Sequence, residues 1–358
     1  MMDVQPKDAW VLYPTDILFQ TPFWSEVKLH LGWKTHAFDF AFPGVEGDML
    51  VLTRHLGNGI KAAYVQQGPE NGPNPDEYGV FLEKLSEAIA RHLGNDLAFI
   101  RYDLPWPSQY AIDGADQQVL YEGGTTRPEP RIRELRMNFG TRSWNIRKAA
   151  IDMTVADALI IDLEQSEQEI MAAMKPKTRY NIRLARRKGV EVLHSPIDML
   201  PSFYELYSQT AKRNKFQPCG YEYFSALFSA FASSPDSSEV YFLLAKHEGN
   251  ILAGAIVTIS GRAATYLFGA SSSEKRNLMG PYALQWAGIC LARSKGCTTY
   301  DMGAVSPSRD PHHPFFGMYR YKTGFGGKIV RRCGSWDYPL NTDEYISFRN
   351  AEMIGMAD

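Results

Sequence analysis

Cysteine is scarce in this chain of 358 residues. The four cysteines, Cys219, Cys290, Cys297 and Cys333, form no Cys-x-x-Cys pair and show no regular spacing. This pattern argues against a disulfide framework and against a zinc site built from thiolates. We therefore expect reduced thiols in a cytoplasmic protein.

Long hydrophobic runs are also missing. No stretch approaches 18 uninterrupted apolar residues, so we expect no membrane-spanning segment. The first 14 residues contain an acid and a proline but no apolar core, so no secretory signal is visible. Apolar residues make up 44% and charged residues 22%, as in ordinary globular proteins, and the length favours two domains.

Acidic residues are absent from one strongly basic segment, 175-KPKTRYNIRLARRKGV-190. It carries seven Lys or Arg in a chain whose formal net charge is only −2. The near-neutral total argues against a protein that coats nucleic acid with its whole surface. Ser166 and Glu169 form a possible capping box for a preceding helix that should end near Lys175, before Pro176.

The basic segment itself is predicted to be a helix over 177–188, ended by Gly189, with Thr178, Ile182 and Ala185 facing the core. One interpretation is a solvated charged face. The other is a platform for an anionic partner, such as RNA phosphates, a lipid pyrophosphate or an anionic membrane surface, because no acid offsets the like charges. The candidate anion-binding residues are Lys177, Arg179, Arg183, Arg186 and Arg187.

The expected elements repeat in the two halves of the chain. In the second half, 240–271 reads as three strands joined by short turns, which predicts an antiparallel meander. A helix over 281–296 and a short strand over 297–303 follow. The first half has the same order, with strands at 34–42, 49–56 and 60–68, a helix at 76–94 capped by Asp76, and a strand at 97–104.

Two further segments complete this outline. The stretch 105–131 is rich in turn residues and is expected to be a surface excursion, and a last strand is expected at 328–340. The repeated order of meander, helix and strand is similar to that of the GNAT (N-acyltransferase) fold. That fold is a mixed α/β sheet that splits open where the acyl donor binds. We therefore expect two tandem GNAT-like domains of mixed sheets in an α/β protein.

Four stretches, in the same order along the chain, resemble signatures of the Fem family, the aminoacyl-tRNA-dependent peptidoglycan transferases also called FemABX. The basic helix is one of them. The others are 20-QTPFWSEVKLHLGW-33, 278-LMGPYALQWAGI-289, and 300-YDMGA-304 followed by 318-MYRYKTGFGG-327.

The resemblance implies an enzyme that transfers an aminoacyl group from aminoacyl-tRNA to an amine of the peptidoglycan precursor's stem peptide. The acceptor would be a muramyl-pentapeptide, linked either to a nucleotide or to a lipid. It also implies that the first domain, which would bind the precursor, comprises 1–154 and takes back 334–358. The second, on the donor side, would be 155–333. No heptad run is present, so we expect the compact type without a coiled-coil arm. We further expect a monomer that is cytoplasmic, with peripheral contact at the inner membrane face.

Aminolysis of an ester requires an uncharged amine beside the carbonyl and a stabilised oxyanion, so a cation in a cleft is expected rather than a catalytic triad. No Gly-x-Ser-x-Gly motif is present. Lys322, by resemblance, matches a family lysine credited with activity, and a surface lysine is the plainer alternative. Asp301 is a candidate for orienting a cation or the amine. Its alternative role is to form the turn before Gly303.

Lys28 matches, by resemblance, a lysine that holds the precursor's diphosphate. The family's phosphate-binding arginine is not cleanly present, since Cys219 falls near its place, and Arg213 is the candidate stand-in. Tyr223 also matches a family position, with a core residue as its alternative. The remaining substrate-binding candidates are Trp24, Arg101, Asp103 and Tyr266.

The sequence predicts no metal site and no cofactor, with aminoacyl-tRNA as co-substrate. Two adjacent histidines, His312 and His313, have no patterned cysteine or carboxylate nearby. An acyl-CoA-dependent N-acyltransferase is the main alternative, but 275-KRNLMGPYA-283 has one glycine where that class cradles pyrophosphate, and a proline without an N–H follows it. A non-enzymatic RNA-binding protein is the third reading, although no RNP or KH motif is present.

Overall fold

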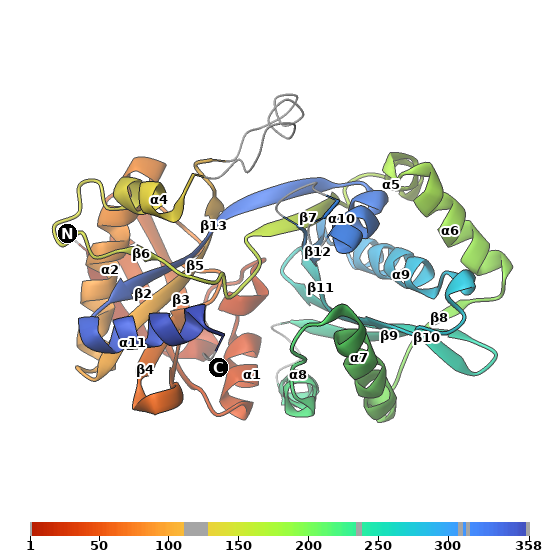
Figure 1. The fold of residues 1–358 in the computed structure, drawn as a ribbon, viewed down its shortest axis with the longest axis horizontal. Coiled ribbons are helices and arrows are strands. Elements are labelled where there is room, and N and C mark those ends of the chain that lie inside the picture. The colour runs from red at the N-terminus through yellow and green to blue at the C-terminus, as the bar shows by residue number, and fades with distance from the viewer. Residues whose placement is uncertain (1, 111–127, 234–237, 307–310, 313–315, 356–358) are drawn as a thin grey trace. The chain divides into compact units, whose positions relative to one another are not determined.

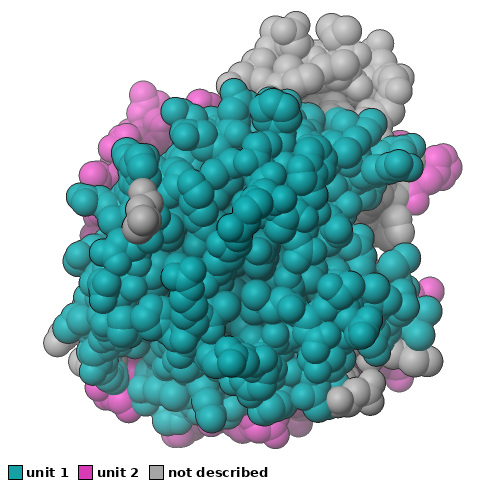
Figure 2. All heavy atoms as spheres, turned by 90° about the vertical axis from the view of Figure 1, so that its left-hand side faces the viewer, with its two compact units in different colours: residues 1–156, 331–358 teal, residues 157–330 magenta. Residues whose placement is uncertain are grey.

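The structure is a computed structural model that describes residues 2–110, 128–233, 238–306, 311–312 and 316–355 (Figure 1). Its contacts divide the chain into two compact units, coloured separately in Figure 2. Unit 1 comprises 1–156 and 331–358, and unit 2 comprises 157–330. The division falls two or three residues from the boundaries drawn from the sequence, and the assignment of one substrate to each unit stays a prediction.

Unit 1 is a mixed sheet in which the meander β1–β4 is followed by a parallel strand. The strand order is β1-β2-β3-β4-β5-β13, with β6 paired to β13. Only β4 and β5 are parallel. The strands are β1 (Asp3–Lys7), β2 (Lys34–Phe42), β3 (Val45–His55), β4 (Lys61–Val65), β5 (Leu97–Pro107), β6 (Arg147–Lys148) and β13 (Lys328–Pro339).

Helices cover both faces of this sheet because alternate residues of β5 point to opposite sides. Ile100 lies in the core under α2, which contributes Phe81 and Leu85, whereas Phe99 packs against Phe348 of α11. The helices are α1 (Pro22–His30), α2 (Tyr78–Leu93), α4 (Pro130–Met137) and α11 (Thr342–Met353), with 3-10 turns at Ala9–Val11, Leu18–Gln20, Gly57–Gly59 and Pro75–Glu77.

Two sequence expectations for unit 1 concern the cap of α2 and the excursion over 105–131. Asp76 does not cap α2, because Pro75–Glu77 forms a 3-10 turn that leads directly into the helix, whose N-cap is Glu77. Most of the expected excursion over 105–131 lies outside the described residues. Its described ends are the last residues of β5 and the start of α4.

Unit 2 repeats this plan with the strand order β7-β12-β11-β10-β9-β8. The predicted meander is confirmed, since β9, β10 and β11 pair antiparallel in sequence order, while β11 and β12 are parallel. The strands are β7 (Asp157–Asp162), β8 (Glu191–His194), β9 (Glu239–His247), β10 (Asn250–Ser260), β11 (Ala263–Ser271) and β12 (Thr299–Ala304).

Helices α6 and α9 cover one face of this sheet, and α7 and α8 cover the other (Figure 1). Ile182 of α6 and Leu284 of α9 share one core, whereas Phe203 of α7 meets Phe224 of α8 and Phe242 of β9. The helices are α5 (Glu167–Ala173), α6 (Pro176–Arg187), α7 (Leu200–Asn214), α8 (Tyr221–Ser233), α9 (Gly280–Ser294) and α10 (Phe316–Lys322), with 3-10 turns at Ile197–Met199, Arg276–Leu278 and Thr323–Phe325.

The basic helix forms as the sequence predicts. The capping box of Ser166 and Glu169 opens α5, and Lys175 is the N-cap of α6. Thr178, Ile182 and Ala185 are buried, and Gly189, just after the helix, has a φ of +76° that favours glycine. Among the described helices of unit 2, the longest have 15 residues, so this part of the chain contains no coiled-coil arm.

The sheet of unit 2 opens between β11 and β12. The two strands pair at three positions, the last joining Thr265 to Asp301, although β11 continues to Ser271 and β12 to Ala304. On its other side β11 bulges, because Ile256 and Val257 pair with Phe268 and Tyr266. The bulge and the lost pairing leave backbone and side chains of β11 facing an open space.

Candidate functional site in the second unit

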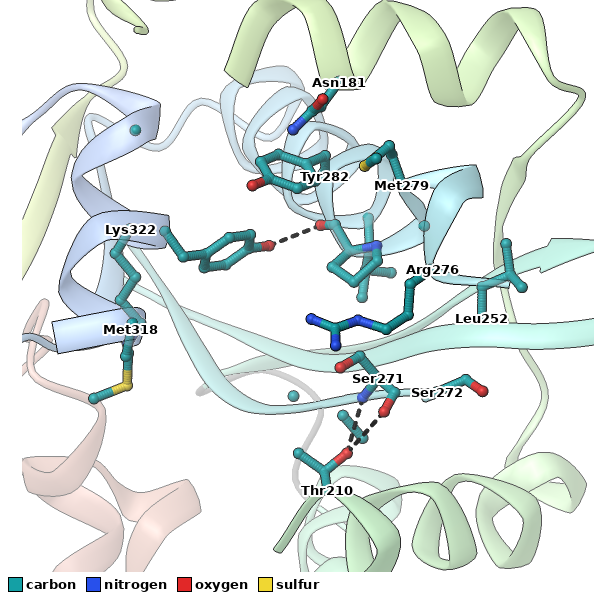
Figure 3. Close-up of a pocket in the computed structure, with 18 of the residues that line it drawn as sticks. Asn181, Thr210, Leu252, Ser271, Ser272, Arg276, Met279, Tyr282, Met318 and Lys322 are labelled. Carbon is teal, nitrogen blue, oxygen red and sulfur yellow. Dashed lines mark hydrogen bonds between the residues drawn. The ribbon is translucent and has the colours of Figure 1, made fainter. Parts of the chain in front are cut away.

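A cavity of about 1060 Å³ lies at this opening (Figure 3). Its walls come from α6, α7, the end of β11, the loop after it, the start of α9, and α10. Cations far outnumber acids in its lining, with seven Lys or Arg against one acid, Glu274. Such a wall attracts an anionic ligand. The cations are Lys175, Lys177, Arg213, Lys275, Arg276, Arg320 and Lys322.

Lys322, the last residue of α10, is the buried cation of this cavity. Its side chain belongs to a residue that is only 7% exposed, and its Nζ donates a hydrogen bond to the main-chain oxygen of Ala304 at 2.7 Å. Burial lowers the pKa of Lys322 to about 8, against the opposing effect of the Asp301 carboxylate. The lysine is therefore mostly protonated at neutral pH, and it holds its proton less strongly than a free lysine does.

Asp301 forms a turn at the end of β12. Its Oδ1 accepts a hydrogen bond from the N–H of Gly303 at 2.6 Å, and Gly303 has a φ of +73°. This is the turn-forming role that the sequence left open for Asp301. Asp301 does not line the cavity, and its effect there is to favour the charged form of Lys322. A direct contact between Asp301 and a substrate stays a prediction.

Tyr266 lines the cavity from β11 and lies across Gly269. A Cβ on Gly269 would stand 1.4 Å from the Tyr266 hydroxyl, so only glycine permits this arrangement. Burial raises the pKa of Tyr266 to about 12, so the hydroxyl keeps its proton and can donate it in a hydrogen bond. The structure thus places four predicted site residues on one cavity, namely Tyr266, Lys322, Arg213 and Lys177.

Arg213 enters the same cavity from α7. Its guanidinium donates to the carbonyl oxygen and the hydroxyl of Ser271 and to the hydroxyl of Ser273, each at 2.9 Å. Arg276, Lys275 and Arg320 also line the cavity, and the sequence analysis missed all three. The segment from Lys275 begins with a basic pair, Lys275 and Arg276. Its charge was the signal that would have identified it.

The basic helix contributes to the cavity and to the surface beside it. Lys177 lines the cavity, whereas Arg183, Arg186 and Arg187 are exposed and have no acidic partner within 4.0 Å among the described residues. Arg179 differs, because it donates to the main-chain oxygens of Ala172 and Met174 and so caps the end of α5. Arg179 therefore has a structural role in addition to its predicted anion-binding role.

Lys28 and Trp24 lie in unit 1, on α1. Lys28 is 6% exposed, and its ammonium lies 4.9 Å from the ring centre of Trp24 and 5.3 Å from that of Trp33. Trp24 is fully buried and donates to the side chain of Gln66 at 2.9 Å. The Trp24 ring has no exposed surface and supports Lys28, and its predicted substrate-binding role stays a prediction.

Arg101 and Asp103 are likewise interior residues of unit 1. Arg101 is 3% exposed and forms two hydrogen bonds each to Asp337 and to Glu352 of α11. Burial opposes its charge, but the two carboxylates outweigh burial and raise the pKa of Arg101. Its predicted substrate-binding role stays a prediction. In the structure, Arg101 holds α11 against the sheet.

Asp103 is 2% exposed and accepts hydrogen bonds from the hydroxyls of Tyr64 and Ser335. Burial raises the pKa of Asp103 to about 6 in spite of these bonds. The residue is part of a buried polar network. As with Arg101, the predicted substrate-binding role of Asp103 stays a prediction.

Tyr223 packs in an aromatic cluster of unit 2. Its ring contacts Phe268 of β11 at 5.7 Å, and the same cluster holds Phe224 and Tyr207. Burial raises the pKa of Tyr223, although the residue as a whole is only half-buried, so the structure leaves its core alternative open. Cys219, where an arginine was expected, lies beside Tyr207. A substrate-binding role for Tyr223 stays a prediction.

The residues that the structure describes include no helix long and apolar enough to cross a membrane. They also include no group of three or more His, Cys, Asp or Glu that could hold a metal ion. His312 is among them, and His313 lies outside the described residues.

The chain matches the model of the FemAB family over residues 10–248 and 237–352. It belongs to the FemAB family. Among curated relatives, it is 23% identical over 250 residues to the lipid II:glycine glycyltransferase of Staphylococcus saprophyticus and 22% over 248 residues to that of Staphylococcus haemolyticus. These alignments cover 54% and 52% of this chain, and the chain spans about 60% of the length of these relatives.

Two solved structures confirm the fold expected from the sequence. The crystal structure of FemX superposes with a TM-score of 0.72 at 19% identity, covering 95% of this chain and 96% of that one. A tandem GNAT protein from the clavulanic acid biosynthesis pathway gives a TM-score of 0.52 at 12% identity, covering 95% and 99%. The chain of this FemAB family member is therefore two GNAT-like units in tandem.

Proposed function

We propose that this FemAB family member is an aminoacyltransferase. It would move an aminoacyl group from aminoacyl-tRNA to an amine on the stem peptide of a peptidoglycan precursor. The observation that carries the proposal is the position of Lys322, a buried cation where β11 and β12 separate, in a cavity with seven cationic residues. Such a site fits an ester that is attached to a polyanionic carrier. The carbonyl oxygen of the ester gains negative charge during the reaction, and a nearby cation stabilises that charge.

The chemistry requires few protein groups. The acceptor's neutral amine attacks the ester carbonyl, a C–N bond forms, and the C–O bond to the ribose breaks. The ribose oxygen leaves with a proton, and the amine nitrogen loses one. Lys322 has three N–H donors, of which one is used by Ala304, so the others are available to the oxygen that becomes negative. Its pKa of about 8 also suits it to pass a proton to the leaving oxygen.

The exposed cations of α6 support the choice of donor. Lys177 lies on the cavity wall, and Arg183, Arg186 and Arg187 continue the positive surface on the same helix. A nucleic acid whose end enters the cavity would place further phosphates along this helix. This interpretation favours a platform for an anionic partner over a merely solvated face.

The acceptor would be a muramyl-pentapeptide precursor, and the names of the relatives favour a lipid-linked one. The enzyme would then work in the cytoplasm and contact the inner face of the membrane peripherally. Lys28, held between two tryptophan rings in unit 1, is the candidate contact for the acceptor's diphosphate. No cofactor is required beyond the two substrates.

A donor competition tests the proposal. Purified protein would be offered aminoacyl-tRNA pools or acetyl-CoA with a muramyl-pentapeptide precursor, and the product weighed by mass spectrometry. We expect a mass gain of one aminoacyl residue, lost in Lys322→Met and kept in Lys295→Met, a matched change at a surface lysine. An acetyl gain would replace the proposal with the CoA-dependent alternative.

A further inference from the structure

Helix α4 of unit 1, yellow in Figure 1, turns apolar side chains outward. Ile132 and Leu135 are 52% and 53% exposed, and Phe139, just past the end of the helix, is 72% exposed. These positions are spaced as i, i+3 and i+7, so they form one stripe along the helix. The neighbouring α2 shows the usual arrangement, because its exposed side chains include Lys84 and Arg91. A contiguous group of exposed apolar side chains marks an interaction surface.

The opposite face of α4 fixes the orientation of this stripe. Met137 is buried in the core of unit 1, and a Cβ on Gly79 of α2 would stand 1.6 Å from the Met137 main-chain oxygen. Glu134, on the inward side, accepts a hydrogen bond from the Lys148 N–H at 2.9 Å. Because the helix cannot rotate without breaking these contacts, the apolar stripe stays exposed.

The loop that follows α4 adds a tryptophan. Asn138 donates to the Ile146 carbonyl oxygen at 2.8 Å and accepts from the Ile146 N–H at 3.0 Å, so the two ends of the loop meet. Phe139 leaves this junction, and Trp144, 48% exposed, returns to it. The Trp144 backbone has a φ of +52°, which is unusual for a bulky residue, and Arg147 donates to its carbonyl oxygen at 2.8 Å. A strained backbone that keeps a large ring in solvent indicates a use for the ring outside the fold.

The segment around these apolar side chains is basic. Residues 129–148 carry six Lys or Arg and two acids, in a chain whose formal net charge is −2. Two of the exposed arginines each pair with one acid of unit 1, Arg136 at 3.8 Å and Arg142 at 2.5 Å. Arg131 and Arg147 have no acidic partner within 4.0 Å in the part of the chain that the structure describes. Positive charge is therefore left over beside the apolar stripe.

This combination matches the surface of a membrane better than other partners. A nucleic acid would bind the arginines but bury little of Ile132 and Leu135, and protein interfaces are depleted of charge at their centre. An anionic bilayer places negative headgroups directly above an apolar layer, so it uses arginine and aliphatic side chains together. Tryptophan favours the boundary between these two layers.

We propose that Ile132, Leu135, Phe139 and Trp144, the α4 surface, dock unit 1 on an anionic lipid bilayer. The inference rests on the proposed function in its lipid-linked form, because a docked unit 1 would meet an acceptor held in the membrane. Helix α4 has eight residues, too few to span a bilayer, so its side chains would enter only the boundary between headgroups and acyl chains.

The test measures binding of the full chain to sedimented vesicles of phosphatidylcholine, with and without phosphatidylglycerol. We expect tighter binding to the vesicles that contain phosphatidylglycerol. Replacing Leu135 and Phe139 together by Ser should weaken this binding at least about tenfold, because two large apolar side chains would no longer leave water. The matched control replaces Leu193 and Ile197 by Ser, two exposed apolar residues of unit 2, and should bind as the unchanged protein does. All four sites are exposed, so both variants should fold.

Two further variants separate the apolar contribution from charge and from folding. Trp144→Gly removes the ring and suits the left-handed backbone, so vesicle binding should fall while the melting temperature stays the same or rises. Arg131→Gln should weaken binding to phosphatidylglycerol vesicles about fivefold, the factor for one charge near an anionic surface, and leave phosphatidylcholine vesicles unaffected. Its control is Arg91→Gln, an exposed site about 18 Å along α2 from Gly79, which should change little.

The outcomes distinguish the α4 surface from the proposed function. The variants at Leu135 and Phe139 should lower aminoacyl transfer to a precursor embedded in vesicles and leave transfer to a nucleotide-linked precursor unchanged. Vesicle binding that depends on α4, without transfer to either precursor, would support the surface and count against the function. Transfer by a protein that does not bind vesicles, or whose binding ignores the α4 variants, would refute the surface and leave the function standing. If the variants instead abolish self-association measured by sedimentation velocity, the stripe contacts a second copy of the chain and the bilayer assignment is overturned.

Discussion

Lys322 and Ala304 join the last residue of α10 to the last residue of β12. The hydrogen bond from Nζ to the carbonyl oxygen, at 2.7 Å, holds a charged amine inside unit 2. The burial that makes this amine useful for an ester also makes it costly to fold. Activity and stability should therefore respond in opposite directions when the charge is removed.

The first prediction concerns the opposite effects of Lys322 on activity and on stability. Lys322→Met should abolish aminoacyl transfer while raising the free energy of unfolding at pH 7, because it removes a buried ammonium. The pKa falls from 10.5 to about 8 on folding, which corresponds to a cost of up to about 3 kcal/mol, partly offset by the lost hydrogen bond of about 1 kcal/mol. Denaturant unfolding at pH 7 measures the change.

The pH dependence gives a control for the same prediction. Between pH 8 and 10.5 the folded protein binds fewer protons than the unfolded chain, so Lys322 makes stability rise with pH across that window. Lys322→Met should lack this rise. A large loss of stability at pH 7 in Lys322→Met would instead show that the lysine is chiefly structural.

The second prediction concerns α6. Replacing Arg183, Arg186 and Arg187 together by Gln should weaken tRNA binding and flatten its salt dependence, because up to three phosphate contacts would be lost. The matched control is Lys34, Lys84 and Arg91, three exposed cations of unit 1, replaced in the same way. Filter binding at several salt concentrations measures both. Equal behaviour of the two triple variants would show that α6 is only a solvated face.

The third prediction concerns the tail of unit 1. Arg101→Met should lower the free energy of unfolding by about 3–5 kcal/mol, because Asp337 and Glu352 would remain buried without their cation. Helix α11 should become open to proteolysis before the rest of the unit. The exposed pair of Lys295 and Glu239 serves as control, and Lys295→Gln should leave the free energy of unfolding nearly unchanged. An intact α11 in Arg101→Met would contradict this account.

The fourth prediction concerns Asp103, whose pKa rises from 3.8 to about 6 on folding. Between these values the folded protein binds more protons than the unfolded chain, so stability should fall as pH rises from about 4 to about 6. Asp103→Asn should remove this slope, since the amide stays neutral and its oxygen still accepts a hydrogen bond. Unfolding at pH 4, 5, 6 and 7 compares the two proteins, and identical slopes would count against the raised pKa.

Periodic and turn signals explain why much of the fold could be predicted. Strand β2 occupies the predicted range 34–42, and α9 begins at Gly280, one residue before the predicted start at Pro281. Helices α7 and α8 were not predicted. Their apolar faces are dominated by aromatic residues such as Phe203 and Phe224, whose partners lie on strands far away in the sequence. Local patterns do not reveal such partners.

The candidate site was less accessible from the sequence. The predicted residues Lys177, Arg213, Tyr266 and Lys322 line one cavity, whereas Arg101 and Trp24 lie in the interior of unit 1. A charged residue at a strand end looks the same in sequence whether it faces a cleft or a buried acid. For Arg101 the difference depends on Asp337 and Glu352, which lie far away in the sequence and form ion pairs with it in the fold. Arg276 was not predicted for the same reason, because only the fold brings it to the cavity that Arg213 of α7 also lines.

The division of unit 1 between the two ends of the chain has a consequence for synthesis. Strand β13 pairs with β5, and Arg101 of β5 binds Glu352, so the unit needs residues made after the whole of unit 2. On the ribosome, unit 2 can complete its sheet first, while the first 156 residues wait for their last strand. A nascent chain stopped before residue 331 should therefore hold a folded unit 2 behind an unfinished N-terminal half.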